Sequence, residues 1–125
     1  MRSLSLGILL SFALATAAKA DVLAGGPIFG TVSQTRADCL LFNAGSSSVS
    51  ITSVTLYDDG GSAVSPNVNT CSSHPLGPNR TCYVFATINL HWYSCKAVVA
   101  SKTNIRGTLE IRDAQAAVLD NVELR

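Results

Sequence analysis

The sequence lacks the features that mark several large functional classes. Residues 21–125 contain no cluster of Lys and Arg, which argues against the basic surface that binds nucleic acid. They contain no apolar run of the roughly 20 residues that a membrane-spanning helix needs. A glycine-rich phosphate loop, a dinucleotide-binding fingerprint and a Gly-x-Ser-x-Gly motif are also missing. We therefore expect no nucleic-acid partner, no membrane span in this part of the chain and no cofactor.

The first feature that is present is an export signal. Arg2 supplies a positive charge, an apolar run follows over residues 4–15, and Ala18-Lys19-Ala20 places small residues where a signal peptidase reads them. This layout predicts a cleavable signal peptide over residues 1–20 and a mature protein that begins at Asp21. Retention as an uncleaved anchor is the alternative. The expected location is secreted or periplasmic.

Removal of the signal changes the charge balance of the chain. The full sequence has 9 Lys and Arg against 8 Asp and Glu, a formal charge of +1. Arg2 and Lys19 leave with the signal and every acid stays, so the mature part is nearly neutral and slightly acidic. Residues 21–125 are long enough for one domain with a modest core.

Short strands separated by turns account for most of the mature sequence. Val, Ile, Thr and Tyr are frequent, and clusters of Gly, Asn, Asp and Ser lie between them. Residues 105–112 alternate apolar and polar side chains, the period of a half-buried strand. The other expected strands cover residues 36–43, 49–57, 82–88 and 92–100. A slip of the apolar phase predicts a β-bulge near Thr52-Ser53.

Turn chemistry predicts the segments between these strands. Asp58-Asp59-Gly60-Gly61 predicts a hairpin turn, since glycine readily takes a positive φ. Residues 62–69 predict an edge strand or a loop, because Pro66 cannot donate to a ladder.

The last segment fits two structures. Val118, Val122 and Leu124 suit a final strand, whereas Asp113 is a residue type that caps a helix, here over residues 114–121. We favour the strand, because it would pair back on residues 105–112. About seven short strands then predict an all-β fold, an antiparallel sandwich.

The four cysteines all lie in the mature part, at Cys39, Cys71, Cys82 and Cys95. An even number after a signal peptide predicts two disulfides. Zinc is the alternative, but zinc ligands usually include cysteine pairs two to four residues apart, and no such pair is present. The sequence also has no Cys-x-x-Cys redox motif. The number of cysteines alone allows several disulfide pairings.

The region around the last cysteine resembles an immunoglobulin-like domain. Tyr93-Ser94-Cys95 has the spacing of a tyrosine corner, and Cys39 lies on an early strand. The resemblance implies a bridge between sheets from Cys39 to Cys95, which leaves Cys71 to pair with Cys82. The core tryptophan of antibody domains is missing from residues 49–57, so the resemblance supports an immunoglobulin-like sandwich and not an antibody-type domain.

The mature chain also resembles small exported bacterial β-sandwich proteins of unknown function. Cys39-Leu40-Leu41-Phe42-Asn43 carries one part of the resemblance, and a cysteine pair around Leu76-Gly77-Pro78-Asn79 carries the second. Cys95 ahead of Ile105-Arg106-Gly107-Thr108-Leu109 is the third. The resemblance implies an export address and an immunoglobulin-like sandwich, and it implies no activity.

Residues suited to catalysis or metal binding are few. A small hydrolase would need His74 or His91 as a base, with Asp58 or Asp59 as the acid that orients it, but their spacing does not bring these groups together. The same aspartates offer oxygens to calcium, yet the glutamate that closes a calcium loop is absent. The sequence therefore predicts no catalytic residue, no metal site and a solvated His91.

The remaining candidate is a binding patch of Tyr83, Phe85, His91 and Trp92. Tyr83 and Phe85 lie in the phase opposite Cys82, so they face outward if the cysteine side is the core. The alternative is that a loop covers them.

These features predict an exported, non-catalytic binding or interaction module with a protein or glycan partner. One alternative is a fimbria-like assembly subunit that pairs edge strands, with residues 21–34 as a free arm. A small hydrolase is the second alternative.

Overall fold

The computed structural model describes residues 19–72 and 74–125 of the chain. The expected signal peptide therefore lies outside the described residues except for its last two positions. Within the described residues there are nine strands and no helix. The strands are β1 (Asp21–Ile28), β2 (Gln34–Asn43), β3 (Ile51–Asp58), β4 (Ala63–Val64), β5 (Val68–Asn69), β6 (Thr81–Thr87), β7 (Tyr93–Val99), β8 (Ile105–Asp113) and β9 (Val118–Leu124).

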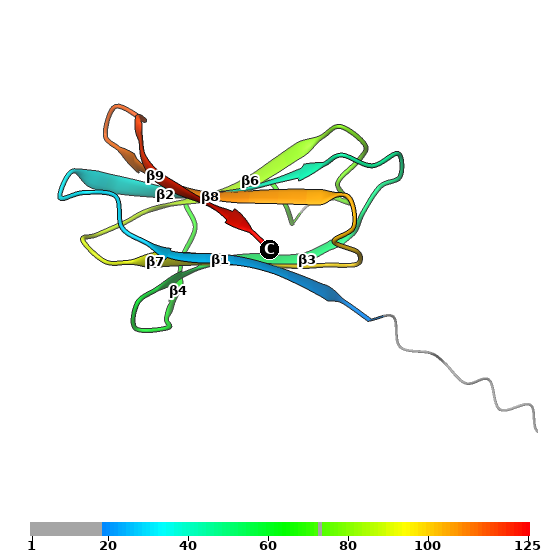
Figure 1. The fold of residues 1–125 in the computed structure, drawn as a ribbon, viewed down its shortest axis with the longest axis horizontal. Helices are drawn as coiled ribbons and strands as arrows, with labels where there is room; N and C mark the ends of the chain where they lie inside the picture. Colours follow the sequence, from blue (N-terminus) through cyan, green and yellow to red (C-terminus); the bar gives the residue numbers. More distant parts are fainter. Residues whose placement is uncertain (1–18, 73) are drawn as a thin grey trace, which may run out of the picture.

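The strands form two layers, as Figure 1 shows. One sheet has the order β1-β7-β3-β4 and the other β5-β6-β2-β8-β9. Every pair of neighbouring strands is antiparallel. The all-β prediction is confirmed, and the core lies between the layers because alternate side chains of β2, β6, β7 and β8 are buried.

The expected count of about seven strands was too low. Residues 21–34 are not a free arm, because β1 pairs along β7 from Asp21 opposite Val99 to Ile28 opposite Tyr93. Residues 62–69 hold two short strands, with β4 at the edge of one sheet and β5 at the edge of the other. Pro66 lies between them, where the chain crosses from one layer to the other.

Several local predictions are confirmed. The register of β3 against β7 shifts between Ile51 and Ser53, where the bulge was expected. The β3–β4 hairpin closes with Gly61 N–H donating to Asp58 O, and Gly61 has a φ of 79°. That geometry is a three-residue loop that ends in a glycine bulge. The last segment is a strand paired with β8, not a helix.

The structure contains both disulfides. Cys39 on β2 bonds to Cys95 on β7, with 6.2 Å between their Cα atoms, and so joins the two sheets through the core. Cys71 bonds to Cys82 at the start of β6, with a Cα separation of 4.9 Å. Beside the first bridge, the buried Tyr93 hydroxyl accepts a hydrogen bond from Asn89 N–H at 3.0 Å. The long bridge therefore fixes the layers and the short one fixes a loop.

One lateral side of the sandwich is closed by backbone hydrogen bonds between the sheets. Ala24 of β1 and Arg125, directly after β9, donate to each other's carbonyl oxygens, both at 3.0 Å. Leu124 packs where Gly25 and Gly107 leave room, because a Cβ on either glycine would lie within 2.8 Å of its side chain. The opposite side has only the short strands β4 and β5.

Candidate functional site

The four residues of the expected binding patch lie in two places. Tyr83 and Phe85 face outward on β6, with nearly parallel rings whose centroids are 6.3 Å apart. His91 and Trp92 lie in the loop between β6 and β7. Trp92 packs against Phe29 of the β1–β2 loop, at a centroid distance of 5.7 Å. The structure therefore offers two candidate surfaces instead of one.

The first surface, on the outer face of the five-stranded sheet, is tied to an ion-pair network. The guanidinium carbon of Arg36 lies 3.8 Å from the centre of the Phe85 ring. Arg36 Nε is 2.5 Å from Asp38 Oδ1, and Arg112 Nε is 3.0 Å from Asp38 Oδ2. Arg112 also pairs with Glu110.

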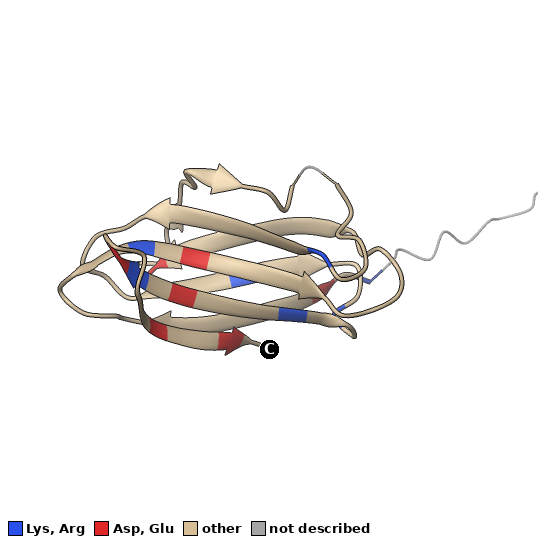
Figure 2. Ribbon diagram, turned by 90° about the horizontal axis from the view of Figure 1, so that it is seen from above, with Lys and Arg blue, Asp and Glu red and all other residues tan. Residues whose placement is uncertain are grey.

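Two acids and two bases balance each other in this network. Figure 2 shows these charges side by side on neighbouring strands. Asp38 is nearly buried beneath its partners, and half-buried Phe85 is already covered by Arg36. The part of this face around Phe85 is therefore covered by its own contacts, whereas Tyr83 and Phe42 stay exposed.

The second surface is formed by loops at one end of the sandwich. It is the loop patch, and we define it as Phe29, Val32, Leu90 and Trp92. The exposed fractions are 82% for Val32, 57% for Leu90 and 50% for Trp92. Figure 1 shows the loop after β1 and the loop before β7 at the same end of the molecule. Exposed apolar side chains that gather in one place often mark an interaction site.

A buried glutamine holds the two loops of the patch together. Gln34 is 4% exposed, and its Oε1 accepts a hydrogen bond from Gly30 N–H at 2.9 Å. Its Nε2 donates to Asn89 O at 2.7 Å and to His91 O at 2.8 Å. One side chain thereby satisfies three backbone groups in two loops that are far apart in the sequence. The backbone of the two loops that carry the loop patch is therefore held in place without a bound partner.

Sequence reasoning missed Gln34 and three of the four patch residues. A single glutamine at the start of a strand has no pattern that distinguishes it from a surface residue. Phe29, Val32 and Leu90 lie in loops, where neither strand nor helix period applies. Only Trp92 was predicted, because it falls within eleven positions of the sequence together with Tyr83, Phe85 and Tyr93.

Replacement of Gln34 by alanine is expected to loosen the loop patch. Three backbone groups would lose their partner, so the free energy of unfolding should fall by about 1–3 kcal/mol. Acrylamide should quench Trp92 fluorescence more strongly in Gln34→Ala than in the wild type. Gln115→Ala is the matched control, since Gln115 is exposed and its side chain makes no hydrogen bond to the described residues. Equal quenching in the wild type and both variants would show that Gln34 does not hold the loops.

The structure brings His91 and Asp59 together, which the sequence spacing did not suggest. His91 Nδ1 lies 3.2 Å from Asp59 Oδ1, and both side chains are about half exposed. No serine or threonine hydroxyl within the described residues is hydrogen-bonded to His91, so the pair has no nucleophile attached. Such exposed pairs usually contribute little to stability.

The other aspartate of that turn has a structural role. Asp58 Oδ1 accepts hydrogen bonds from Gly60 N–H at 3.0 Å and from Ser62 N–H at 2.9 Å, which shapes the hairpin. Across residues 19–72 and 74–125, no group of three or more His, Cys, Asp or Glu side chains is placed to hold a metal ion.

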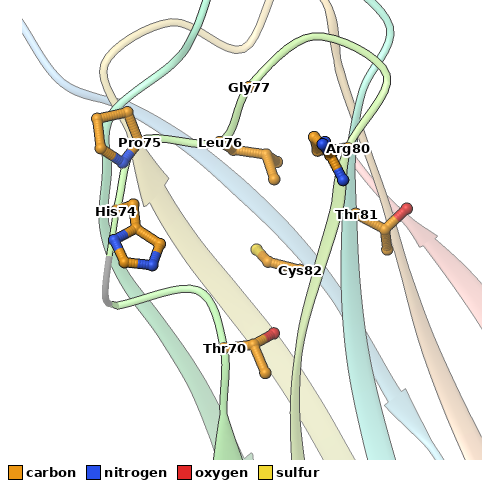
Figure 3. Close-up of a pocket in the computed structure, with 8 residues that line it drawn as sticks. All are labelled: Thr70, His74, Pro75, Leu76, Gly77, Arg80, Thr81 and Cys82. Carbon is orange, nitrogen blue, oxygen red and sulfur yellow. The ribbon is translucent and has the colours of Figure 1, made fainter.

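Two shallow cavities of about 410 Å³ each lie away from the loop patch. Figure 3 shows the first, beside the short disulfide, with His74 on one side and Arg80 on the other. Its walls include Leu76 and Cys82, both buried. The second, which we call the β3 groove, runs along β3 and β4 and reaches Val84 of β6.

The chain matches no protein-family model, no curated protein and no solved structure. Over the part of the chain that the structure describes, no helix is both long and apolar enough to cross a membrane.

Proposed function

We propose that this protein is an exported, non-catalytic binding module and that the loop patch is its contact surface. The observation that carries the proposal is the exposure of Val32, Leu90 and Trp92 on loops that buried Gln34 holds in place. An apolar group that is exposed and rigid gains from burial in a partner and loses little conformational freedom on binding. Both disulfides agree with an oxidising compartment.

The scaffold of this module is a variant of the immunoglobulin-like sandwich. In the sheet order, β5, β6 and β2 take the places of strands D, E and B, and β3 and β7 take those of C and F. The bridge from β2 to β7 and the Tyr93 hydroxyl on Asn89 support the same assignment.

The strand order differs from that of the immunoglobulin fold at one outer position in each sheet. β1 lies beside β7, where strand G would lie, and β8 lies beside β2, where strand A would lie. The variant keeps the central strands and exchanges the outer ones.

Trp92 is the residue on which the interface is centred. Tryptophan is enriched among the few residues that carry most of the energy of an interface. Its indole ring is supported on one side by Phe29, and half of the side chain stays exposed. A flat aromatic surface of this kind suits an apolar side chain of a protein or the apolar face of a sugar ring.

Trp92 is the only tryptophan in the chain, so its fluorescence reports directly on the loop patch. Burial by a partner is expected to shift its emission to shorter wavelength. A photo-crosslinking residue at position 90, introduced in the native host, should capture the partner for identification by mass spectrometry. Trp92→Ala should then weaken binding of the captured partner by about 30-fold or more, as expected for an interface hot spot.

Tyr83→Ala is the matched control for that experiment. It removes an exposed aromatic side chain from the other candidate surface. Loss of binding in Tyr83→Ala with full binding in Trp92→Ala would move the interface to the sheet face and contradict the proposal.

A further inference from the structure

The two lateral sides of the sandwich differ in how far they are closed by hydrogen bonds. On the closed side, Ala24 and Arg125 join the sheets by two hydrogen bonds. On the other side, β4 pairs with only Leu56 and Tyr57 of β3. Residues 51–55 therefore have no strand beside them on that side within the described part of the chain. We call residues 51–55 the open edge.

The ladder between β3 and β4 stops at a proline. Asp58 and Leu56 direct their backbone groups toward β4, where Leu56 lies opposite Val64. Two residues further along, Val54 would face Pro66, which has no N–H. Among the described residues, no backbone hydrogen bond joins Val54 to Pro66. Because backbone groups alternate sides along a strand, Val54 points its N–H and C=O outward and leaves them available.

The open edge itself carries no charge, and the basic side chain of Lys96 lies on β7 opposite Thr55, on the other side of β3. Residues 51–57 include no acidic or basic side chain. The same holds for the lining of the β3 groove beside them, which consists of Thr52, Ser53, Val54, Thr55, Leu56, Ala63, Val64, Ser65, Pro66, Asn69, Ser72 and Val84. Natural edge strands usually carry a lysine or another charge that discourages pairing with other chains. The bulge between Ile51 and Ser53 is the one such safeguard present on β3 itself.

We propose that the open edge pairs with the open edge of a second copy of this chain across a twofold axis. The pairing joins two four-stranded sheets into one continuous antiparallel sheet. In an isologous contact residue i meets residue j and residue j meets residue i, and only residues on the axis meet their own counterparts. Charges of one sign along the edge would therefore face each other and repel. The uncharged Thr52, Ser53 and Thr55 meet this condition.

The free stretch of the edge is the same in two copies of the chain, because β4 pairs only with Leu56 and Tyr57 in each. Residues such as Thr and Val at the edge are suited to a pleated ladder. The contact is short, and interfaces below about 1,200 Å² are usually transient. The expected dimer is therefore weak and forms as the protein concentration rises.

Sedimentation velocity of the oxidised protein tests the proposal, over about 10 µM to 1 mM, where weak interfaces associate. The wild type is expected to shift from monomer to dimer within this range. Ser53→Lys places two like charges close to the axis and should weaken the dimer tenfold or more. Thr81→Lys is the matched control, on exposed β6 surface away from the edge, and should dimerise as the wild type does.

A second measurement locates the contact. Exchange of the Val54 amide proton with solvent should slow as the concentration of the wild type rises, and should not slow in Ser53→Lys. If Ser53→Lys fails to fold, Thr55→Lys replaces it in both measurements. A wild type that stays monomeric at the highest concentration would overturn the proposal. So would a dimer that is insensitive to both lysine variants, or one that Thr81→Lys also dissolves.

The test is independent of the proposed binding function. Trp92→Ala alters the loop patch and leaves the open edge intact, so it should dimerise like the wild type. Failure of the edge proposal would leave the loop patch proposal standing, and the reverse holds as well.

Discussion

Replacing Cys39 and Cys95 together by alanine is expected to lower the free energy of unfolding by about 4 kcal/mol. The bridge spans 56 residues of sequence, and a long closed loop restricts the unfolded chain more than a short one does. A loss of that size is a large share of the about 5–15 kcal/mol by which small domains are stable. Urea unfolding followed by circular dichroism should show it as a lower midpoint.

Removal of the second disulfide is the comparison for the stability loss that we expect from removal of the first. The bond between Cys71 and Cys82 spans 11 residues, so alanine at both positions should cost about 3 kcal/mol in the same measurement. The difference arises because the bridge from Cys39 to Cys95 closes a longer loop of the unfolded chain than the bridge from Cys71 to Cys82 does. A greater loss from the Cys71 and Cys82 pair would contradict the account of which bridge holds the sandwich together.

Asn43→Ala is expected to cost about 3 kcal/mol, because it leaves three backbone groups without partners, in one buried and two partly buried hydrogen bonds. Asn43 at the end of β2 is 0% exposed. Its Nδ2 donates to Ser47 O and to Leu76 O, both at 2.8 Å. Its Oδ1 accepts from Gly45 N–H at 2.9 Å. This one amide therefore joins the loop after β2 to the loop that contains the short disulfide.

Thermal and urea unfolding of the purified variants measure this effect. Asn121→Ala is the control, since Asn121 is exposed and its side chain makes no hydrogen bond to the described residues. It should change stability by less than about 0.5 kcal/mol. Limited proteolysis should also cut Asn43→Ala faster than Asn121→Ala in residues 70–80. Similar stability of the two variants would mean that water replaces the Asn43 amide without penalty.

Sequence reasoning predicted the parts of the fold that are set locally. The alternation in β8 depends on which face of one strand is buried, and the sequence shows it directly. The bulge at Ile51–Ser53 appears as a slip of phase, and the glycine of the β3–β4 turn is required by its positive φ. Each of these depends on neighbouring residues alone.

The parts that sequence reasoning missed are set by distant contacts. β1 contains Gly25-Gly26-Pro27, within the segment that one alternative treated as a free arm, yet it forms a strand because β7 supplies its partners. Gly25 is needed there because a Cβ would lie 2.8 Å from the backbone oxygen of Glu123. The approach of His91 to Asp59 likewise arises only when two loops meet. No local pattern in the sequence predicts contacts between segments that are far apart along the chain.

The strand pairing also determines when the protein folds during its synthesis. β2 lies between β6 and β8, and β1 pairs with β7. The first strands to be synthesised therefore have pairing partners that are synthesised much later. The four-stranded sheet cannot be completed until Val99 of β7 has been made, and the five-stranded sheet cannot be completed until Leu124 of β9 has been made. Folds dominated by such long-range pairs form slowly. A nascent chain of this topology therefore cannot complete its sheets until late in synthesis, and this delay would suit the export that we propose.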